Sequence, residues 1–287
     1  MEPTLILEAC LPFELKLRWL QSQAFRWDKC DGWYYGFVAG APIRVRDHDE
    51  GMEFESDVPE ESLKPSVKRY FRLTQDIGQV HDALREADST GQMDELIRKH
   101  GGMRILRPDP WECLVSYICS QNKPVSGIKE IADDIATEYG TLITFRDVPL
   151  HAFPPAQRLV AIDPKALKKL APGLSRAERI HEVATHITDG SLDLAALARM
   201  PHQHARAVLM SYDGIGEKIA DCVSLFALDK TEAFPVDTHI EKGLKPYAEK
   251  LTAGKVNADL IHQLRETFGT NAGYAGQLLF LEHYPES

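Results

Sequence analysis

The stretch LMSYDGIGEKIADCVSLFALDKTEAFPVDTH, residues 209–239, decides the fold. Two apolar helical runs flank a DGIG turn at residues 213–216. We expect Gly214 and Gly216 to adopt positive φ, so that backbone N–H groups point outward at an anion. A helix expected to begin at about Glu217 adds unsatisfied N–H groups and the positive end of its dipole. The stretch therefore predicts a binding site for a phosphate group.

Lys218 lies beside this turn, at the second position of the expected helix. The positive end of the helix dipole disfavours the ammonium form there, and desolvation under a bound substrate acts in the same direction. A lysine that has lost its proton is a nucleophile. The alternative is a solvated lysine that pairs with Asp221 at i,i+3.

Two segments carry a family resemblance: KIADC at 218–222 and FPVDTH at 234–239. In residue type and spacing they resemble the helix-hairpin-helix and the Gly/Pro-Asp loop of base-excision DNA glycosylases, and most closely the 8-oxoguanine DNA glycosylases. The resemblance implies that Lys218 attacks the sugar carbon of the damaged nucleotide and that Asp237 supports this step. Because members that remove only the base lack the hairpin lysine, it also implies a bifunctional glycosylase and lyase.

The chemistry of that reaction explains the two residue types. Displacement of a purine passes through an oxocarbenium-like state, whose positive charge a nearby carboxylate such as Asp237 stabilises. An amine then forms a Schiff base, which acidifies the neighbouring sugar C–H and permits β-elimination. Asp237 could instead serve only as the N-cap of a helix from Thr238, after Pro235. We expect Asp237 to do both.

Composition and charge limit this interpretation. The chain has 287 residues, 44% of them hydrophobic, which is enough for two or three subdomains. Its net charge of −10 opposes binding to DNA phosphates, so a local basic cluster has to provide the attraction. The alternative for such a cluster is a solvated helix face. The candidate cluster comprises Arg158, Lys165, Lys168, Lys169, Arg176 and Arg179.

The sequence indicates neither export nor a cofactor. The N-terminus lacks a basic segment followed by an apolar core, and no apolar run reaches the length of a membrane span. The five cysteines form no Cys-x-x-Cys pair, which argues against a zinc site or a disulfide framework. Glycosylases with an iron–sulfur cluster need four closely spaced cysteines, a pattern that this sequence does not contain. We expect no cofactor or metal, no membrane, and a monomer in the cytoplasm, at the bacterial nucleoid, or in the nucleus.

The predicted fold class is α+β. Residues 1–100 are expected to form a small antiparallel β-sheet domain with helices, and residues 101–287 a larger all-α glycosylase body with the hairpin at 203–229. The apolar pattern becomes helical from Glu60, and nearly everything from Met93 onward reads as helix. Turn residues separate the expected strands, which lie at 4–7, 33–38, 43–46 and 52–55.

Two helix starts have recognisable capping patterns. DPWE at 109–112 provides an N-cap and a proline at the first helical position, so a helix is expected from Pro110 to Ser120. SRAE at 175–178 has the spacing of a capping box and opens a helix that Gly190 ends. Both patterns indicate where helices begin, and by themselves they indicate no function.

The first of these helices ends in CSQN at 119–122. This resembles the family segment whose asparagine enters the gap left by the flipped nucleotide, which implies that Asn122 is a wedge. Whether or not it acts as a wedge, Asn122 is a residue at the C-terminal end of a helix, ahead of Pro124.

The residues that would face the opposite base depart from the animal and plant type of the family. Gly127 stands where that type has an arginine, and Ser175 precedes Arg176 where it has tyrosine followed by arginine. One cytosine-reading arginine, Arg176, is therefore kept, and the aromatic wedge is lost. We expect weaker discrimination of the base opposite the lesion.

The lesion pocket matches the family in part. Ser22 stands where the family has a glycine, in a segment that contributes a backbone carbonyl to the base. Phe280 matches the stacking aromatic, whereas Gly276 occupies the glutamine position. Gln277 is one residue out of register, and it could substitute only if the helix is rotated or kinked.

Two further candidates rest on the same analogy. Cys222 would stack on the other face of the base, although it could be an ordinary buried cysteine. His239 is expected to contact a DNA phosphate, although a lone histidine is more often a satisfied surface or core residue.

Three functions stay open at this point. The first is an 8-oxoguanine glycosylase/lyase whose partner is double-stranded DNA with a damaged base. The second is a glycosylase of the same fold for other damaged purines, such as alkylated ones. The third is a non-catalytic helix-hairpin-helix DNA-binding protein.

Overall fold

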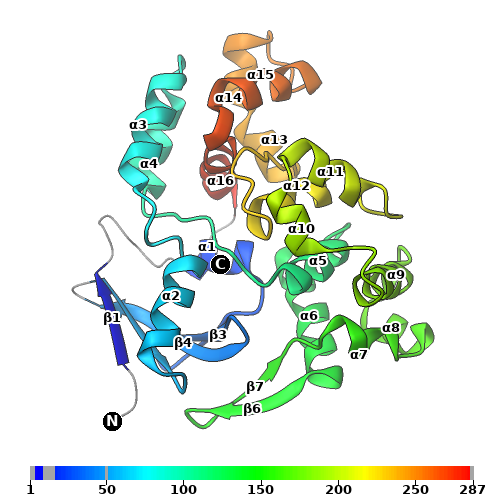
Figure 1. Ribbon diagram of the computed structural model, residues 1–287. Helices are drawn as coiled ribbons and strands as arrows, with labels where there is room; N and C mark the ends of the chain where they lie inside the picture. The colour runs from blue at the N-terminus through cyan, green and yellow to red at the C-terminus, as the bar shows by residue number, and fades with distance from the viewer. Residues whose placement is uncertain (1–3, 9–16, 49–50, 285–287) are drawn as a thin grey trace.

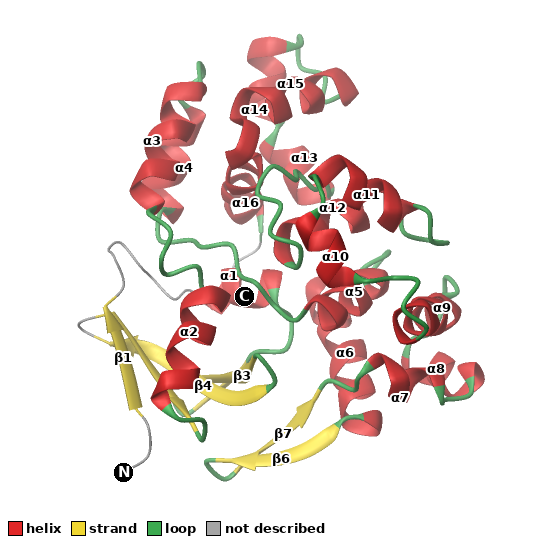
Figure 2. Ribbon diagram, in the orientation of Figure 1, coloured by secondary structure: helices red, strands yellow, loops and turns green. Residues whose placement is uncertain are grey.

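The computed structural model describes residues 4–8, 17–48 and 51–284 (Figure 1). A small sheet lies at one end of the molecule, and helices form most of the rest, with a separate pair of strands beside them (Figure 2). The five strands lie in the order β1-β5-β4-β3-β2, and every neighbouring pair is antiparallel. The strands are β1 (Thr4–Glu8), β2 (Asp28–Cys30), β3 (Trp33–Val38), β4 (Ala41–His48) and β5 (Gly51–Ser56). The four expected strands are thus confirmed, and β2 is an additional short edge strand.

Alternation along the central strands explains how the sheet packs. Ile43 and Val45 of β4 are fully buried, as is Phe54 of β5, which lies opposite Val45 in the register. Side chains two residues apart point to one face of a strand, so these form an apolar layer. The helices on this part of the chain are α1 (Leu17–Gln23), α2 (Glu60–Tyr70), α3 (Ile77–Ala87) and α4 (Gln92–His100).

The rest of the chain forms the helical body, as expected. Its centre is the contact between α5 and α12, and α11 packs on α12 to complete the hairpin. The helices are α5 (Pro110–Cys119), α6 (Val125–Tyr139), α7 (Ala156–Val160), α8 (Pro164–Leu170), α9 (Arg176–Thr188), α10 (Leu194–Arg199), α11 (His202–Met210), α12 (Glu217–Phe226), α13 (Thr238–Gly243), α14 (Lys245–Leu251), α15 (Ala258–Phe268) and α16 (Ala272–His283), with a 3-10 turn η1 (Gly269–Asn271) before α16.

One interruption of the helical body was not expected. A β-hairpin, β6 (Thr141–Phe145) and β7 (Val148–Ala152), follows α6. Its turn residues Arg146 and Asp147 both have positive φ, at 51° and 60°, as a two-residue hairpin turn requires. Phe145 and Leu150 pack with aromatic residues of β3, so the hairpin attaches the body to the sheet.

The two predicted caps have different outcomes. Asp109 caps α5 through hydrogen bonds from the N–H groups of Trp111 and Glu112, both 3.0 Å long. Ser175 precedes α9, but it has a φ of 53° and makes no side-chain cap bond, so the predicted capping box is wrong. A capping serine needs an extended backbone to direct its hydroxyl at the helix, and the left-handed conformation prevents this.

Candidate active site

A cavity of about 910 Å³ lies where the hairpin meets the C-terminal helix α16. Its lining comes from α1, the end of α5 and the loop after it, the start of α6, α12, the loop before α13, α13 itself, and α16. It brings together nine of the eleven residues predicted from the sequence and leaves out Gly214 and Arg176. The nine are Ser22, Asn122, Gly216, Lys218, Cys222, Asp237, His239, Gln277 and Phe280.

Lys218 occupies the second position of α12 and reaches the cavity. Its Nζ donates a hydrogen bond to Ser120 Oγ at 3.1 Å and lies 5.3 Å from the ring centroid of Tyr117. Ser120 Oγ in turn donates to the Tyr117 carbonyl at 2.7 Å. Neither Ser120 nor Tyr117 was singled out from the sequence, because their relation to Lys218 depends on how α5 packs against α12.

The alternative pairing of Lys218 with Asp221 is wrong. Asp221 is 1% exposed, and its carboxylate binds Arg206 Nε and Arg265 Nη2, each at 2.9 Å. Lys218 and Asp221 are only three positions apart, at i and i+3, yet these bonds hold the Asp221 carboxylate in the core. Among the described residues, no carboxylate forms an ion pair with Lys218.

Asp237 is the N-cap of α13, as predicted. Its Oδ1 accepts hydrogen bonds from the N–H groups of His239 and Ile240, both 2.9 Å long. These bonds fix the carboxylate at the cavity. The loop before Asp237 is anchored separately by Phe234, whose side chain is fully buried. Arg265 holds the Phe234 carbonyl at 3.0 Å. A charged group fixed in this way can stabilise a positive charge without reorganising.

Cys222 and Phe280 contribute soft and aromatic surface to the cavity. Cys222 is 4% exposed, and burial raises the pKa of its thiol to about 12, although Lys218 opposes the shift. The thiol is therefore neutral near pH 7. The Phe280 ring is stacked with Tyr284, with centroids 5.1 Å apart and an interplanar angle of 23°. Such walls suit a flat, polarisable ring.

Gln277 lies in the cavity without the kink or rotation that was thought necessary. Gln277, Phe280 and Tyr284 all line the cavity, and their spacing of i, i+3 and i+7 is one face of a regular helix. Gly276 faces the core instead, since a Cβ there would lie 3.1 Å from the Phe234 ring. The out-of-register glutamine is thus the one that faces the cavity.

His239 lies at the edge of the cavity. Its Nδ1 is 3.1 Å from the His283 carbonyl, and its ring packs edge-on against Phe280 and Tyr284. These contacts fix the ring between α13 and α16. Contact with a DNA phosphate stays a prediction.

The hairpin turn differs from expectation at one glycine. Gly214 has a φ of 71°, as predicted, whereas Gly216 has a φ of −84° and a ψ of −179°, which is extended backbone. The reason is that Gly216 is the N-cap of α12, a position that takes extended geometry. A Cβ on Gly216 would meet nothing within 4 Å, so its surface is open to a ligand. Ile215, 3% exposed, anchors the turn.

Gln121 connects three loops, a role that the sequence did not indicate. Its Nε2 donates to the Gly214 carbonyl at 2.8 Å, and its Oε1 accepts from Arg179 at 2.7 Å. Its backbone carbonyl accepts a bond from Arg176. The loop after α5, the hairpin turn and the start of α9 are thereby held together at the cavity.

Arg176 does not extend into the cavity. It is 3% exposed, and its guanidinium binds the backbone carbonyls of Pro172 and Gln121. A base contact would require this side chain to leave its partners, so its DNA contact stays a prediction. The wider basic cluster is partly neutralised, because Lys168 pairs with Glu178 at 2.9 Å and Arg179 with Asp213 at 3.4 Å.

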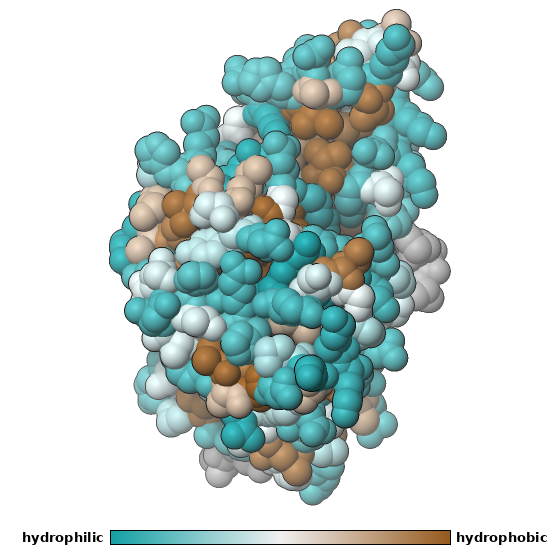
Figure 3. Space-filling model, turned by 90° about the vertical axis from the view of Figure 1, so that its right-hand side faces the viewer, coloured by the Kyte–Doolittle hydropathy of each residue, from teal (hydrophilic) through white to brown (hydrophobic). Residues whose placement is uncertain are grey.

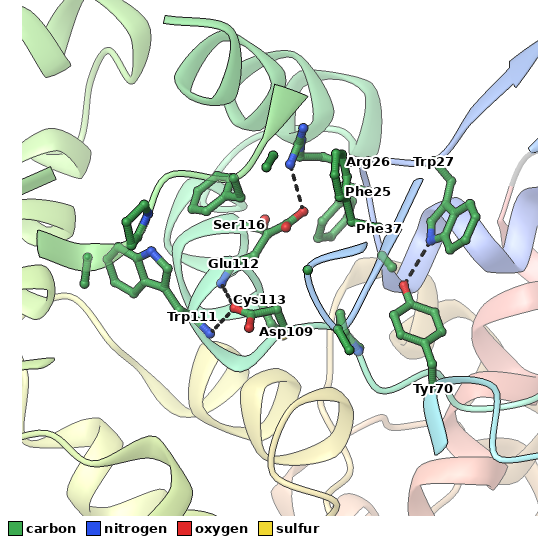
Figure 4. A pocket seen from close by; sticks show the side chains of 18 of the residues that line it. Phe25, Arg26, Trp27, Phe37, Tyr70, Asp109, Trp111, Glu112, Cys113 and Ser116 are labelled. Carbon is green, nitrogen blue, oxygen red and sulfur yellow. Dashed lines mark hydrogen bonds and ion pairs between the residues drawn. The ribbon is translucent and has the colours of Figure 1, made fainter. Parts of the chain in front are cut away.

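A second cavity, of about 390 Å³, lies between the sheet, α5 and β7 (Figure 4). Trp27 and Tyr70 are joined there by a 2.9 Å hydrogen bond, and Arg26 lies 3.5 Å from a Glu112 oxygen. Burial raises the pKa of the Glu112 carboxyl, an effect that Arg26 opposes. Neither Lys218 nor Asp237 reaches it, so we take the larger cavity as the active site.

The described residues include no group of three or more His, Cys, Asp or Glu side chains that could hold a metal ion. Cys10 lies outside the described residues. No helix in the described ranges is both long and apolar enough to cross a membrane. The face shown in Figure 3 is mainly hydrophilic, with smaller apolar patches.

The fold and this constellation agree with known families. Residues 7–114 match the model of the 8-oxoguanine DNA glycosylase N-terminal domain, and residues 115–259 match that of the HhH-GPD superfamily of base excision DNA repair proteins. The N-glycosylase/DNA lyase OGG1 of Arabidopsis thaliana is 27% identical over 94% of this chain and 77% of its own length. The N-glycosylase/DNA lyase of Saccharomyces cerevisiae is 31% identical over 77% and 66%.

Solved structures of 8-oxoguanine glycosylase/lyases are similar to this protein over nearly the whole chain. The 8-oxoguanine glycosylase/lyase of Clostridium acetobutylicum, in complex with double-stranded DNA containing cytosine opposite 8-oxoguanine, is 29% identical with a TM-score of 0.85. The match covers 94% of this chain and 91% of that one. Its apo form is 30% identical, with a TM-score of 0.83 over 93% and 92%. The chain belongs to the HhH-GPD superfamily and, within it, to the 8-oxoguanine DNA glycosylase/lyases.

Proposed function

We propose that this protein excises 8-oxoguanine from double-stranded DNA and then cleaves the strand at the resulting site. The observation that carries the proposal is the placement of Lys218 and Asp237 on one cavity whose walls suit a purine. Relatives named N-glycosylase/DNA lyase support it. Such a substrate puts the enzyme at the bacterial nucleoid or in the nucleus.

The proposed reaction begins with a flipped nucleotide, whose base lies between Cys222 and Phe280. The neutral amine of Lys218 forms a bond to C1′, and the C1′–N9 bond breaks with its electron pair going to the departing base, which takes up a proton. Asp237 opposes the positive charge that develops on the sugar.

Strand cleavage follows from the same covalent link. The amine nitrogen loses one proton, and the C1′–O4′ bond breaks with its electron pair going to O4′, which takes up a proton. The nitrogen lone pair thereby forms a protonated C1′=N Schiff base on Lys218. A proton then leaves C2′, the electron pair of that bond forms a C2′=C3′ double bond, and the C3′–O bond breaks with its electron pair going to the 3′-phosphate. Ser120 Oγ, 3.1 Å from Nζ, holds the amine during binding. No redox partner is needed.

Borohydride trapping tests the nucleophile. Reduction of the Schiff base should cross-link the wild-type protein to a duplex with 8-oxoguanine opposite cytosine, and Lys218→Gln should give no cross-link. Lys123→Gln is the matched control, because Lys123 lines the same cavity; it should still cross-link. Persistent trapping in Lys218→Gln, or its loss only in Lys123→Gln, would reject Lys218 as the nucleophile.

The same assay separates substrates. Duplexes with an alkylated purine address the alternative glycosylase function, and a catalytically inert hairpin protein would bind every duplex without any cross-link. We expect the 8-oxoguanine duplex to react fastest.

A further inference from the structure

The second cavity, of about 390 Å³, is distinct from the active site although one helix reaches both. Glu112 and Ser116 of α5 line the second cavity, whereas Tyr117 and Ser120, at the C-terminal end of the same helix, line the active-site cavity. Among the described residues, Phe25 is the one that lines both. A molecule in the second cavity would therefore leave the place of the flipped nucleotide unoccupied.

Aromatic rings from four different segments of the chain line this second cavity. They belong to Trp27, Phe37, Trp111 and Phe153. The Trp111 ring is fixed, because its Nε1 donates to the Pro154 carbonyl at 2.9 Å. A preformed cavity of this size, with aromatic walls and a few polar groups, is typical of a small-molecule site. Such walls favour a flat ring that can pack against them.

Glu112 is the polar group whose hydrogen-bonding capacity is least used. Within the described part of the chain, its carboxylate has one partner, Arg26, at 3.5 Å. Arg26 also donates to Asp133 at 3.0 Å and to the His151 carbonyl, so its guanidinium has stronger partners elsewhere. Figure 4 shows the Glu112 side chain pointing towards Arg26 and away from Trp111. The carboxylate can therefore accept hydrogen bonds from a ligand.

Ser116 and the local charge favour the same kind of ligand. Ser116 is 3% exposed and lines the cavity, and its hydroxyl has no hydrogen-bond partner in the described part of the chain. A buried hydroxyl without a partner costs free energy, which a bond to a ligand would recover. The charged lining residues are the acids Asp109 and Glu112 and the single cation Arg26. This balance favours N–H donors and positive charge.

We propose that the second cavity binds a planar heteroaromatic molecule with an amidine-type edge, in which an amino group and a ring N–H lie side by side. The two N–H groups donate to the two oxygens of Glu112, as a guanidinium does to a carboxylate. The Ser116 hydroxyl completes the polar contacts, and the aromatic walls cover the faces of the ring. This inference goes beyond the proposed function, because the ligand needs neither DNA nor Lys218.

Calorimetric titration of the full-length protein with 2-aminobenzimidazole tests the site, and we expect one equivalent to bind. Benzimidazole has the same ring without the amino group, so it should bind about 10-fold more weakly. Glu112→Gln replaces one acceptor oxygen by an NH₂ donor and should weaken 2-aminobenzimidazole binding about 10-fold or more. Asp237→Asn should bind this probe as tightly as the wild type, because Asp237 lines only the active-site cavity.

Gln157→Trp tests the site without altering a buried charge. Gln157 lies on α7 and lines the cavity from an exposed position, so an indole there should obstruct the cavity while the core stays unchanged. We expect about a 10-fold loss of probe affinity, even if Glu112→Gln proves unstable. Arg158→Trp is the matched control, because Arg158 is also exposed but lies outside the cavity. It should leave probe affinity unchanged.

The results that would overturn the site differ from those that would reject the proposed function. Absence of saturable binding, or wild-type affinity in Gln157→Trp, would overturn the site. Equal affinities for the two probes would overturn the amidine-type edge. A loss of affinity in Asp237→Asn alone would place the probe in the active-site cavity and overturn the proposal as well. Failure of borohydride trapping would reject the proposed reaction and leave these binding results unaffected.

Discussion

The chemical centre and the rim that faces DNA are built in different ways. Lys218 and Asp237 are placed by their positions at helix N-termini, as the second residue of α12 and the N-cap of α13. The rim is placed by side chains that reach between loops: Arg176 binds a carbonyl 55 residues away, and Gln121 binds one 93 residues away.

This difference separates reactivity from recognition. A helix N-terminus determines the geometry of its first residues whatever lies around it, so the reactive pair is robust to changes elsewhere. Loops joined by a few hydrogen bonds can change their side chains without disturbing that pair. Among the predicted base-facing positions where this chain departs from the family type, Ser175 lies on such a loop, whereas Ser22, Gly127 and Gly276 lie on the helices α1, α6 and α16.

The largest effect is expected at Asp237. Asparagine caps helices about as well as aspartate, so Asp237→Asn should keep α13 and the melting temperature. It removes the negative charge, so single-turnover excision should fall about 10²- to 10³-fold. Quench-flow excision and thermal unfolding on the same preparation measure the two effects.

Asp193→Asn is the control, because Asp193 caps α10 by a 2.9 Å bond to the Ala196 N–H and lies outside the active-site cavity. It should leave excision unchanged. Should Asp237→Asn excise at the wild-type rate, Asp237 would be a helix cap and nothing more.

A smaller effect is expected from substitution of the two glycines of the hairpin turn. One substitution should weaken DNA binding and the other should lower folding stability. Gly216→Ala has permitted backbone angles and open space, so stability should be unchanged while a methyl group meets the incoming phosphate. We expect the Kd for DNA to rise about 5- to 50-fold, which corresponds to about 1–2 kcal/mol of lost binding free energy.

Gly214→Ala should behave in the opposite way. Its φ is 71° and a Cβ would collide with Arg179, so we expect a loss of about 1–3 kcal/mol of folding stability. Fluorescence anisotropy with labelled duplex and chemical denaturation measure the pair. Equal stability losses in both variants would show that Gly216 has no role at the DNA surface.

Much of the chemical centre could be predicted from sequence because its signals are local. The spacing from the DGIG turn to Lys218 and the proline before Asp237 specify the helix starts directly. The four strands were predictable for the same reason, since their alternation of apolar and polar residues is visible within each segment.

The rim could not be predicted, because its signals depend on tertiary contacts. Nothing in the segment SRAE indicates that Ser175 is left-handed, since the bonds of Arg176 to distant carbonyls enforce this. Matched to the family, Gln277 is one residue away from the expected glutamine position. The Phe234 ring packs against Gly276 and leaves no room for a side chain there, so Gln277 is the residue that faces the cavity. The hairpin β6–β7 is short, and its apolar residues need the sheet as a partner.

The smallest expected effect concerns Cys222 and tests whether the base surface is neutral. Burial raises its pKa to about 12, so between pH 6 and pH 9 the thiol stays protonated and should add no step to the pH dependence of excision. A thiol-specific disulfide reagent at pH 8 should modify the exposed Cys30 quickly and Cys222 slowly, because the thiolate is the reactive form. Mass spectrometry of peptides from the labelled protein measures both rates. Fast modification of Cys222 at pH 8 would mean that a thiolate faces the cavity, and the chemical centre would then hold a second anion beside Asp237, where a neutral surface is required.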